Sequence, residues 1–312
     1  MMRLPMDLQQ VICEMAIGDS GKNKFAFVAM RVNKAWAHFV CSVLYRNYRI
    51  SDYLQFVGFV NTISTGAKGS LPYGSYIRSI DLTSVNRYGV DTRVTRLIRH
   101  CNNLRTVSLG HPTSVKADTI ALMARHCQKL QTLQLGGLES FPFMLECDFS
   151  SLRGLRTVDI CSTPLTTNAL HTLPMEIEHI RFARLDALQY MDVKLFLQAR
   201  QKHIQSIRIE QCRFMDGPIA DMIAPLKQLE KLELVGTDIG DPIFEGLADV
   251  PNLCLDTLRI VNTHITDTVL QGFLTARSRS IDRPRVRHLE LADNRFVSDD
   301  MVQALLVRRH CL

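Results

Sequence analysis

Residues 204–234 read IQSIRIEQCRFMDGPIADMIAPLKQLEKLEL, and this stretch begins and ends on the same six-residue pattern. In IQSIRI and in LEKLEL, apolar residues occupy the first, fourth and sixth positions. The pattern occurs nine times, beginning at residues 77, 104, 130, 155, 177, 204, 229, 255 and 286. Seven of the eight steps are 22–27 residues long and the last is 31, which is too regular for chance. The copies therefore form an internal repeat.

Each copy predicts a short strand followed by a helix. The fourth and sixth positions point to one side of a strand, and the residue between them points to the other. Apolar residues at helical spacing follow several copies, as at 117–125, 216–223 and 267–274. Near the expected helix starts stand Asp216, Asp241, Asp267 and Asp299. We expect these carboxylates to satisfy free backbone N–H groups there. The repeat predicts an α/β, right-handed solenoid of about nine units with a parallel inner sheet.

Two further features resemble the cysteine-containing class of leucine-rich repeats. In that class a cysteine stands three residues before the first apolar position, as Cys101 does before Leu104 and Cys127 before Leu130. The turn after the strand in that class reads Ile-Thr-Asp, as residues 265–267 do here. A histidine precedes each of the two cysteines, but zinc sites use ligand pairs at short spacing, and the chain has no CxxC. We interpret the cysteines as small core hydrophobes.

Composition narrows the class of protein. The 312 residues are 46% hydrophobic and 22% charged, which excludes a wholly disordered chain. The net charge of +6 is mild and does not demand nucleic acid as a partner. We expect no membrane span and no signal peptide. Nine cysteines, an odd number, argue against a disulfide framework and for a reducing compartment, cytoplasmic or nuclear.

Residues 1–50 lie outside the repeat and predict a small all-α unit. Leu8, Val11, Ile12 and Met15 form one helical stripe, and a second run of apolar residues at steps of three or four begins at Phe25. Three landmarks in this order resemble an F-box. They are Leu4-Pro5-Met6-Asp7-Leu8, Val32-Asn33-Lys34-Ala35-Trp36 and Leu44-Tyr45-Arg46.

The F-box resemblance implies a partner. So small a helical unit buries too little surface to be stable alone. In the family it docks on the small adaptor subunit of cullin-RING ubiquitin ligases, which links it to the cullin. The adaptor-facing and core set implied for this chain is Leu4, Pro5, Leu8, Ile12, Val28, Val32 and Trp36. Residues 51–75 are predicted as a linker helix and cap, and residues 76–312 as the leucine-rich-repeat solenoid.

The residue between the paired apolar positions lines the inner face of the predicted sheet. In chain order these residues are Asp81, Ser108, Gln134, Asp159, Arg181, Arg208, Glu233, Arg259 and Glu290. One interpretation is an ordinary hydrated sheet face. The other is a charge-assisted binding surface for a target protein, with substrate-binding candidates His179, Arg181, Arg208, Glu210, Glu233 and Arg259.

The remaining candidate sites are a basic segment late in the chain and two motifs that resemble catalytic or phosphate-binding loops. Five arginines fall within eleven residues: Arg277, Arg279, Arg283, Arg285 and Arg287. They predict a solvated loop or a docking patch for an acidic or phosphorylated partner. The GDSG at 18–21 resembles the nucleophile loop of a serine protease, and the Gly-Lys at 21–22 resembles the end of a phosphate-binding loop. Both fail on context, and the phosphate-binding loop also needs a glycine where Ala16 stands. We expect no cofactor, no bound metal and no catalytic residue.

The two modules together favour the substrate-recognition subunit of an SCF-type ubiquitin ligase. The F-box would bind the adaptor, and the inner face of the repeats would hold a target protein that the sequence does not identify. The alternative is a protein-binding scaffold without a ubiquitin role, in which the N-terminal helices only cap the solenoid. An enzyme has only the failed motifs in its favour.

Overall fold

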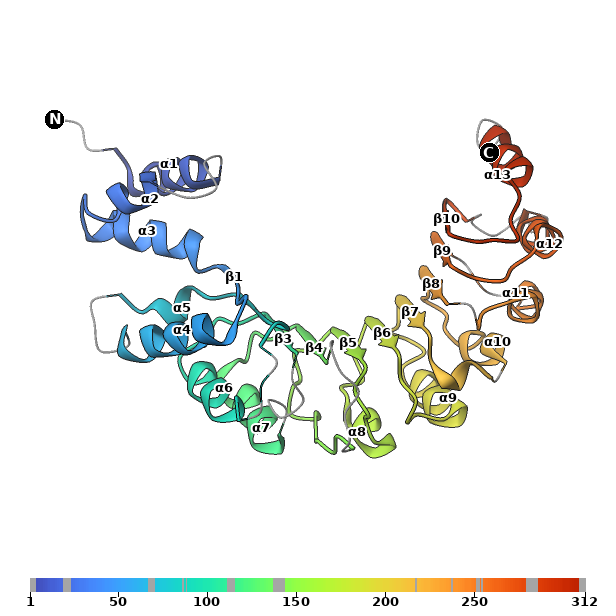
Figure 1. Ribbon diagram of the computed structural model, residues 1–312, viewed down its shortest axis with the longest axis horizontal. Helices are drawn as coiled ribbons and strands as arrows, with labels where there is room; N and C mark the ends of the chain where they lie inside the picture. The colour runs from blue at the N-terminus through green and yellow to red at the C-terminus, as the bar shows by residue number, and fades with distance from the viewer. Residues whose placement is uncertain are drawn as a thin grey trace. The chain divides into compact units, whose positions relative to one another are not determined.

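The computed structural model describes residues 4–18, 24–66, 71–85, 87, 89–110, 116–136, 144–216, 218–236, 238–250, 253, 255–278 and 286–308. The chain divides into two compact units. Unit 1 comprises residues 1–138 with 151–154, and unit 2 comprises residues 139–150 with 155–312. Figure 1 shows the helices and strands of both units, with three successive helices at the start of unit 1. Among the described helices, none combines the length and apolar character that a membrane crossing requires.

Unit 1 begins with helices and continues into repeats. Its helices are α1 (Met6–Gly18), α2 (Lys24–Ala29), α3 (Lys34–Leu44), α4 (Tyr53–Gly66), α5 (Tyr73–Tyr76), α6 (Asp91–Ile98) and α7 (Ala117–His126). Its strands are β1 (Asn47–Arg49), β2 (Ser79–Leu82), β3 (Thr106–Leu109) and β4 (Thr132–Leu135). The four strands pair in parallel and in chain order, with Arg49, Asp81, Ser108 and Gln134 in register.

The first three helices pack around a small core of their own. Ile17, Ala26, Ala29 and Val40 are buried there, with Phe25 and Trp36 half-buried against them. Asn33 caps α3 by accepting a hydrogen bond from the backbone N–H of Trp36 at 2.9 Å. The Trp36 indole donates to Gln9 Oε1 of α1 at 2.8 Å. The tryptophan therefore holds α1, α2 and α3 together from within.

A group of stacked rings joins these helices to the first repeat. Tyr45 follows α3, Tyr48 lies on β1, Phe59 on α4 and Tyr73 on α5. The ring centroids of Tyr48 and Phe59 are 4.2 Å apart, and those of Tyr45 and Tyr73 are 5.3 Å apart. The helix expected within residues 51–75 is α4, which begins just after Asp52; the Asp52 carboxylate accepts a hydrogen bond from the Gln55 N–H at 2.9 Å.

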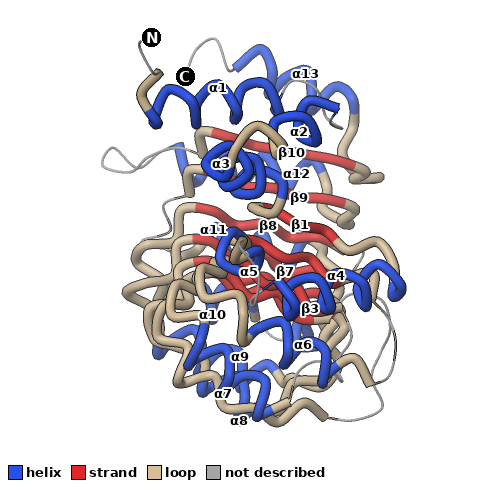
Figure 2. The backbone as a smooth tube through the Cα atoms, turned by 90° about the vertical axis from the view of Figure 1, so that its left-hand side faces the viewer, coloured by secondary structure: helices blue, strands red, loops and turns tan. Residues whose placement is uncertain are grey.

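Unit 2 repeats one strand and one helix. Its strands are β5 (Thr157–Cys161), β6 (His179–Ala183), β7 (Ser206–Glu210), β8 (Lys231–Val235), β9 (Thr257–Val261) and β10 (His288–Ala292). Its helices are α8 (Thr167–Thr172), α9 (Tyr190–Ala199), α10 (Ile219–Ile223), α11 (Asp241–Ala248), α12 (Asp267–Ser278) and α13 (Asp299–Arg308), with a 3-10 turn at Arg213–Asp216. The strands are parallel and follow one another in chain order, as Figure 2 shows for β7 to β10.

The nine sequence copies are the nine strands β2 to β10, so the prediction of an α/β leucine-rich-repeat solenoid is confirmed. In β2 to β9 the fourth and sixth positions of each copy are buried, as with Ile207 and Ile209. In β10 the corresponding Leu289 and Leu291 are only half-buried. Strand β1 was not predicted. It has three residues and pairs with β2 through Tyr48 and Ile80, without a copy of the repeat pattern.

The residue after each strand of unit 2 takes a left-handed backbone. These residues, with φ between 48° and 141°, are Ser162, Arg184, Gln211, Gly236, Asn262 and Asp293. Five of the six then donate their N–H to the last carbonyl of the next strand, as Ser162 does to Ala183 O at 2.9 Å. A left-handed turn costs a non-glycine residue about 1–2 kcal/mol. It recurs because it both directs the chain off the sheet and extends the ladder by one hydrogen bond.

Two of the four helix-start aspartates, Asp241 and Asp267, bridge neighbouring repeats. The Asp241 carboxylate accepts from the Thr266 N–H at 2.8 Å and from its hydroxyl at 2.9 Å. Asp267 accepts in the same way from the Ser298 N–H at 2.9 Å. The free N–H groups that these carboxylates satisfy belong to the next repeat, so the bonds fix the repeat stacking.

Arg200, at the end of α9, is fully buried and fastens two repeats. Its guanidinium donates to the carbonyls of Pro174 at 3.0 Å, of His171 and Phe196 at 3.2 Å, and of Leu173. His171 and Leu173 belong to the end of α8, whose last carbonyls lack helical partners. Burial lowers the pKa of Arg200 to about 10, so the side chain stays charged at neutral pH.

We expect Arg200→Met to lower the free energy of unfolding by about 2–4 kcal/mol, because it keeps an apolar stem but strands several buried carbonyls. The matched control is Lys202→Met at an exposed site, where we expect a change of about 0.5 kcal/mol or less. Urea denaturation followed by circular dichroism measures both. Equal effects of the two substitutions would contradict this role for Arg200.

Candidate functional site

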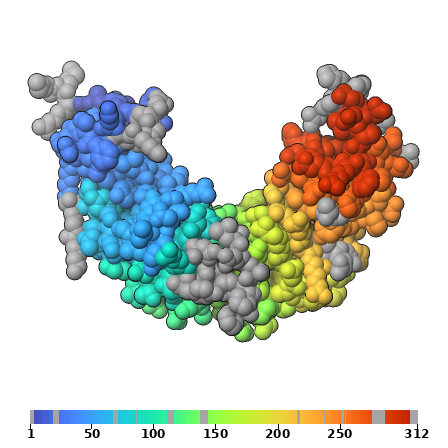
Figure 3. Space-filling model, viewed as in Figure 1, coloured from blue at the N-terminus to red at the C-terminus, as the bar shows by residue number. Residues whose placement is uncertain are grey.

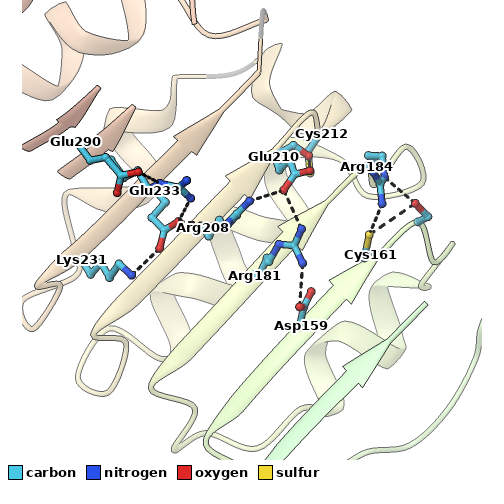
Figure 4. A network of polar contacts seen from close by, with 12 residues as sticks. Asp159, Cys161, Arg181, Arg184, Arg208, Glu210, Cys212, Lys231, Glu233 and Glu290 are labelled. Atoms are coloured by element: carbon cyan, nitrogen blue, oxygen red, sulfur yellow. Dashed lines mark hydrogen bonds and ion pairs between the residues drawn. The ribbon is translucent and has the colours of Figure 1, made fainter. Parts of the chain in front are cut away.

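A row of charged side chains crosses the face of the unit 2 sheet that points away from the helices. Backbone register places one residue of each strand in this row: Asp159, Arg181, Arg208, Glu233, Arg259 and Glu290. Figure 4 shows the side chains of this row joined by a continuous network of ion pairs. We call this surface the open face. It contains every residue that the sequence nominated for target binding.

The strand register places two positive charges of the row side by side, and Glu210 compensates them. Arg181 and Arg208 lie directly opposite each other on β6 and β7, where like charges repel. Glu210 stands two residues after Arg208 on the same side of β7. Its Oε2 accepts from Arg181 Nη2 at 2.8 Å and from Arg208 Nη2 at 2.9 Å. The other amino group of Arg181 contacts Asp159 Oδ2 at 3.0 Å.

Glu233 is the second bridging carboxylate. Its side chain is 10% exposed and contacts three cations: Lys231 at 2.7 Å, Arg259 at 3.2 Å and Arg208 at 3.3 Å. Arg259 continues the network to Glu290, whose carboxylate is 2.9 Å away and mostly exposed. Four acidic and four basic side chains thus neutralise one another across six strands.

The network keeps its carboxylates ionised. Burial disfavours the charged form of Glu210, but the hydrogen bonds from Arg181 and Arg208 outweigh it and hold its pKa below the ordinary value. For Glu233, burial is likewise outweighed by the hydrogen bonds from Lys231 and Arg259, and its pKa is also lowered. The network leaves buried hydrogen-bonding atoms unused, namely Nε of Arg181 and of Arg208 and Oδ1 of Asp159.

The geometry limits how this face can bind a target. Each of Arg181, Arg208 and Arg259 already contacts two carboxylates, so a target must use the outward atoms or displace an internal pair. The least engaged polar groups at its margins are Glu290, Lys231 and the half-buried His179, which lies in register with Thr157 and Ser206. The face therefore suits polar, hydrogen-bonded contact with a protein surface.

The arginine segment at 277–287 falls mostly outside the described residues. Arg279, Arg283 and Arg285 lie outside them, and Arg277 is placed only as a backbone position in the last turn of α12. Arg287 lies before β10, with its Nη1 3.5 Å from Asp256 Oδ1. The docking-patch interpretation of this segment stays a prediction.

The N-terminal helices present a second candidate surface, which is apolar. Leu4, Pro5, Leu8, Ile12, Val28 and Val32 are exposed, whereas Trp36 belongs to the core of the three helices. The predicted stripe of α1 faces outward: Leu8 is 51% exposed, and the buried residues of that helix are Cys13 and Ile17. Sequence reasoning missed Phe27, which is 72% exposed, because it does not fall on the spacing of three or four residues that begins at Phe25.

The cysteines of the predicted repeat slot lie in the core, which confirms the interpretation as small hydrophobes. Cys101 and Cys127 are buried, and the Cys127 thiol contacts the Cys101 carbonyl at 3.4 Å. Burial raises the pKa of Cys127 to about 12. Over the described part of the chain, no three His, Cys, Asp or Glu side chains gather to hold a metal ion. The third His-Cys pair, at 310–311, and residues 19–21 of the GDSG loop lie outside the described residues.

Comparison with known proteins finds likeness in structure only. No protein-family model and no curated protein sequence matches the chain. The structure resembles LegL7, a leucine-rich repeat-containing protein of Legionella pneumophila, at 11% identity and a TM-score of 0.45, over 80% of this chain and 88% of that one. It resembles the Rad7 and Elc1 complex of yeast at 14% identity and a TM-score of 0.49, over 96% and 85% of the two chains. It resembles the internalin InlF of Listeria monocytogenes at 13% identity and a TM-score of 0.34, over 73% and 77%. Since these TM-scores are below 0.5, we infer function from the chain's own residues alone.

We expect Glu233→Gln to lower the free energy of unfolding by about 1–3 kcal/mol, because it leaves Arg208, Arg259 and Lys231 without their shared counter-charge. The matched control is Glu245→Gln, at an exposed position of α11, with an expected change near zero. Chemical denaturation at pH 7 measures both. A Glu233→Gln variant as stable as the control would show that the network contributes nothing to folding.

The same network predicts a pH dependence. The pKa values of Glu210 and Glu233 are lowered in the folded state, so their stabilisation is present above the unfolded-state pKa of about 4.3. It is lost as the pH falls below that value toward the folded-state pKa. We expect the stability difference between the natural chain and Glu233→Gln to be constant from pH 7 to about 5 and to shrink below pH 4. A constant difference down to pH 3 would contradict this assignment.

Proposed function

We propose that this protein is the substrate-recognition subunit of an SCF-type ubiquitin ligase complex. In this proposal the first three helices act as an F-box that docks on the adaptor subunit, and the leucine-rich repeats hold the target protein. The observation that carries the proposal is the exposed apolar surface of the N-terminal helices. The order of the three F-box-like landmarks supports the identity of the partner.

Exposure of apolar side chains is concentrated at this end of the chain. Of the fifteen large hydrophobic side chains that are exposed among the described residues, nine lie between Leu4 and Val32. Figure 3 shows these helices in dark blue at the N-terminal end of unit 1. Burying one such side chain gains about 1.5–3 kcal/mol, and soluble monomers rarely leave large apolar patches uncovered. The helices therefore have both a core of their own and a second apolar side suited to a partner protein.

The open face supplies the other half of the proposed role. Its neutralised ion-pair network is polar and consists of arginine, lysine and carboxylate side chains. A target held there would gain reactivity by position, because tethering raises the effective concentration of its lysines near the ubiquitin-charged enzyme. The chain itself would carry out no chemical step. We propose that it acts in the cytoplasm or nucleus, where its many thiols stay reduced.

The test uses the double variant Leu8→Glu with Ile12→Glu on the exposed side of α1. We expect the natural chain to co-elute with the purified adaptor in size exclusion, and the variant to lose at least about a hundredfold in affinity, since two apolar contacts are removed. The matched control is Leu54→Glu with Leu195→Glu, on α4 and α9, where both leucines are exposed. We expect the control to bind as the natural chain does.

Two outcomes separate the alternatives. A natural chain that does not bind the adaptor would remove the ligase role and leave a protein-binding scaffold whose N-terminal helices cap the repeats. Equal adaptor binding by the double variant would show that α1 is not the docking surface. Trp36→Ala is unsuitable for this test, because the indole packs inside the three helices and its loss would disturb their fold.

A further inference from the structure

A small pocket lined by polar and basic residues lies in unit 1 where strands β2, β3 and β4 begin. It has a volume of about 290 Å³. Its lining residues come from α3, from α5 and from the residues that precede the strands: Ser42, Ser75, Tyr76, Arg78, Asn103, Arg105 and Lys129. This volume is at the lower end of ligand pockets, so the pocket suits a small group rather than an extended molecule. Three of the seven side chains carry a positive charge.

The cations of this pocket lack the acidic partners that their counterparts have in unit 2. Among the described residues, no carboxylate lies within ion-pair distance of Arg78, Arg105 or Lys129. Arg78 and Arg105 precede their strands at equivalent repeat positions, joined by a hydrogen bond from the Arg105 N–H to the Arg78 carbonyl. At the same position in unit 2, Arg156 pairs with Glu178 and Arg287 with Asp256, each at 3.5 Å.

The neutral residues that line the pocket hold Lys129 in place and add no negative charge. Asn103 donates from Nδ2 to the Ser75 carbonyl at 2.8 Å and accepts on Oδ1 from Lys129 Nζ at 2.7 Å. The Tyr76 hydroxyl bonds His38 Nδ1, and burial raises the pKa of Tyr76 to about 12, so the phenol is neutral. Glu14, a carboxylate under the influence of Arg78, is held by Arg46 at 3.0 Å.

The surrounding charge favours an anion as well. Residues 1–138 contain 17 Lys and Arg against 7 Asp and Glu, a net charge of +10 in a chain whose total is +6. The positive field of this part raises the local concentration of anions.

We propose that this pocket binds a phosphate monoester, as carried by a phosphorylated serine or threonine of a partner protein. A phosphate monoester carries a charge near −2 at neutral pH and presents three acceptor oxygens. Two guanidinium forks and one ammonium match that charge and those oxygens. The site is independent of the apolar helix surface, so it stands or falls separately from adaptor docking.

The test titrates the full chain with O-phosphoserine at pH 7.5 and low salt, followed by the phosphorus-31 signal. We expect saturable binding that weakens at least about tenfold in the double variant Arg78→Gln with Arg105→Gln. The matched control is Arg156→Gln with Lys202→Gln, which removes the same charge from unit 2, at the equivalent repeat position and at an exposed site. We expect the control to keep its affinity within twofold.

Two further probes identify the source of the phosphate. Inorganic phosphate should bind comparably to phosphoserine, and dimethyl phosphate, with one charge, should bind at least tenfold more weakly. The proposal is overturned by absent phosphoserine binding, or by equal weakening in the control pair. It is also overturned if dimethyl phosphate binds as tightly, which would indicate a nucleic-acid or lipid backbone. Inorganic phosphate binding more than tenfold tighter than phosphoserine would show a site closed to an attached residue, and would equally overturn it.

Discussion

No single repeat of this protein can bury its own apolar side, and the structure depends on that constraint. One strand and one short helix leave the core-facing apolar residues of the strand exposed until the next repeat covers them. Ile180, Ile207 and Leu232 fill this role in register on β6, β7 and β8. Among the described strands, β10 pairs with β9 alone, and its Leu289 and Leu291 remain half-buried. At the other end, β1 and the stacked rings of Tyr48 and Phe59 adjoin the first repeat.

The same stacking dictates the chemistry of the open face. Parallel strands in register stand about 4.8 Å apart, so one residue per repeat forms a continuous row whose charges interact whether or not they are complementary. Arg181 opposite Arg208 would repel, and Glu210 is the residue that makes this register tolerable. Changing either arginine to glutamate would therefore gather carboxylates in one place and disturb the sheet. Neutral substitutions, which only remove a bond, separate target contact from folding more cleanly.

The repeat, the strands and the polar face were predictable because a period of two and a step of 22–27 residues are visible in the sequence. Strand β1 was not, since three residues carry no period. The sequence did not show which N–H groups the helix-start residues Asp241 and Asp267 satisfy, because a carboxylate near a helix is a local signal, whereas Asp241 bonds Thr266 of the next repeat. The division of 1–50, 51–75 and 76–312 stays a prediction. The F-box resemblance implied one adaptor-facing and core set without dividing it, because a stripe of apolar residues does not show what it faces.

The net charge of the whole chain hides a difference in charge between its two parts. Residues 139–312 carry 20 basic against 24 acidic residues, so their net charge is −4, opposite in sign to residues 1–138. Where acids are plentiful, the arginines of the open face are consumed by internal pairs, and burial of Arg200 is offset by carbonyls. Where acids are scarce, Arg78 and Arg105, just before β2 and β3, have no carboxylate within ion-pair distance among the described residues. The same repeated backbone therefore carries different surfaces, depending on which arginines have acidic side chains beside them. The arginines without a nearby carboxylate among the described residues are the ones best suited to bind an anion from outside the chain.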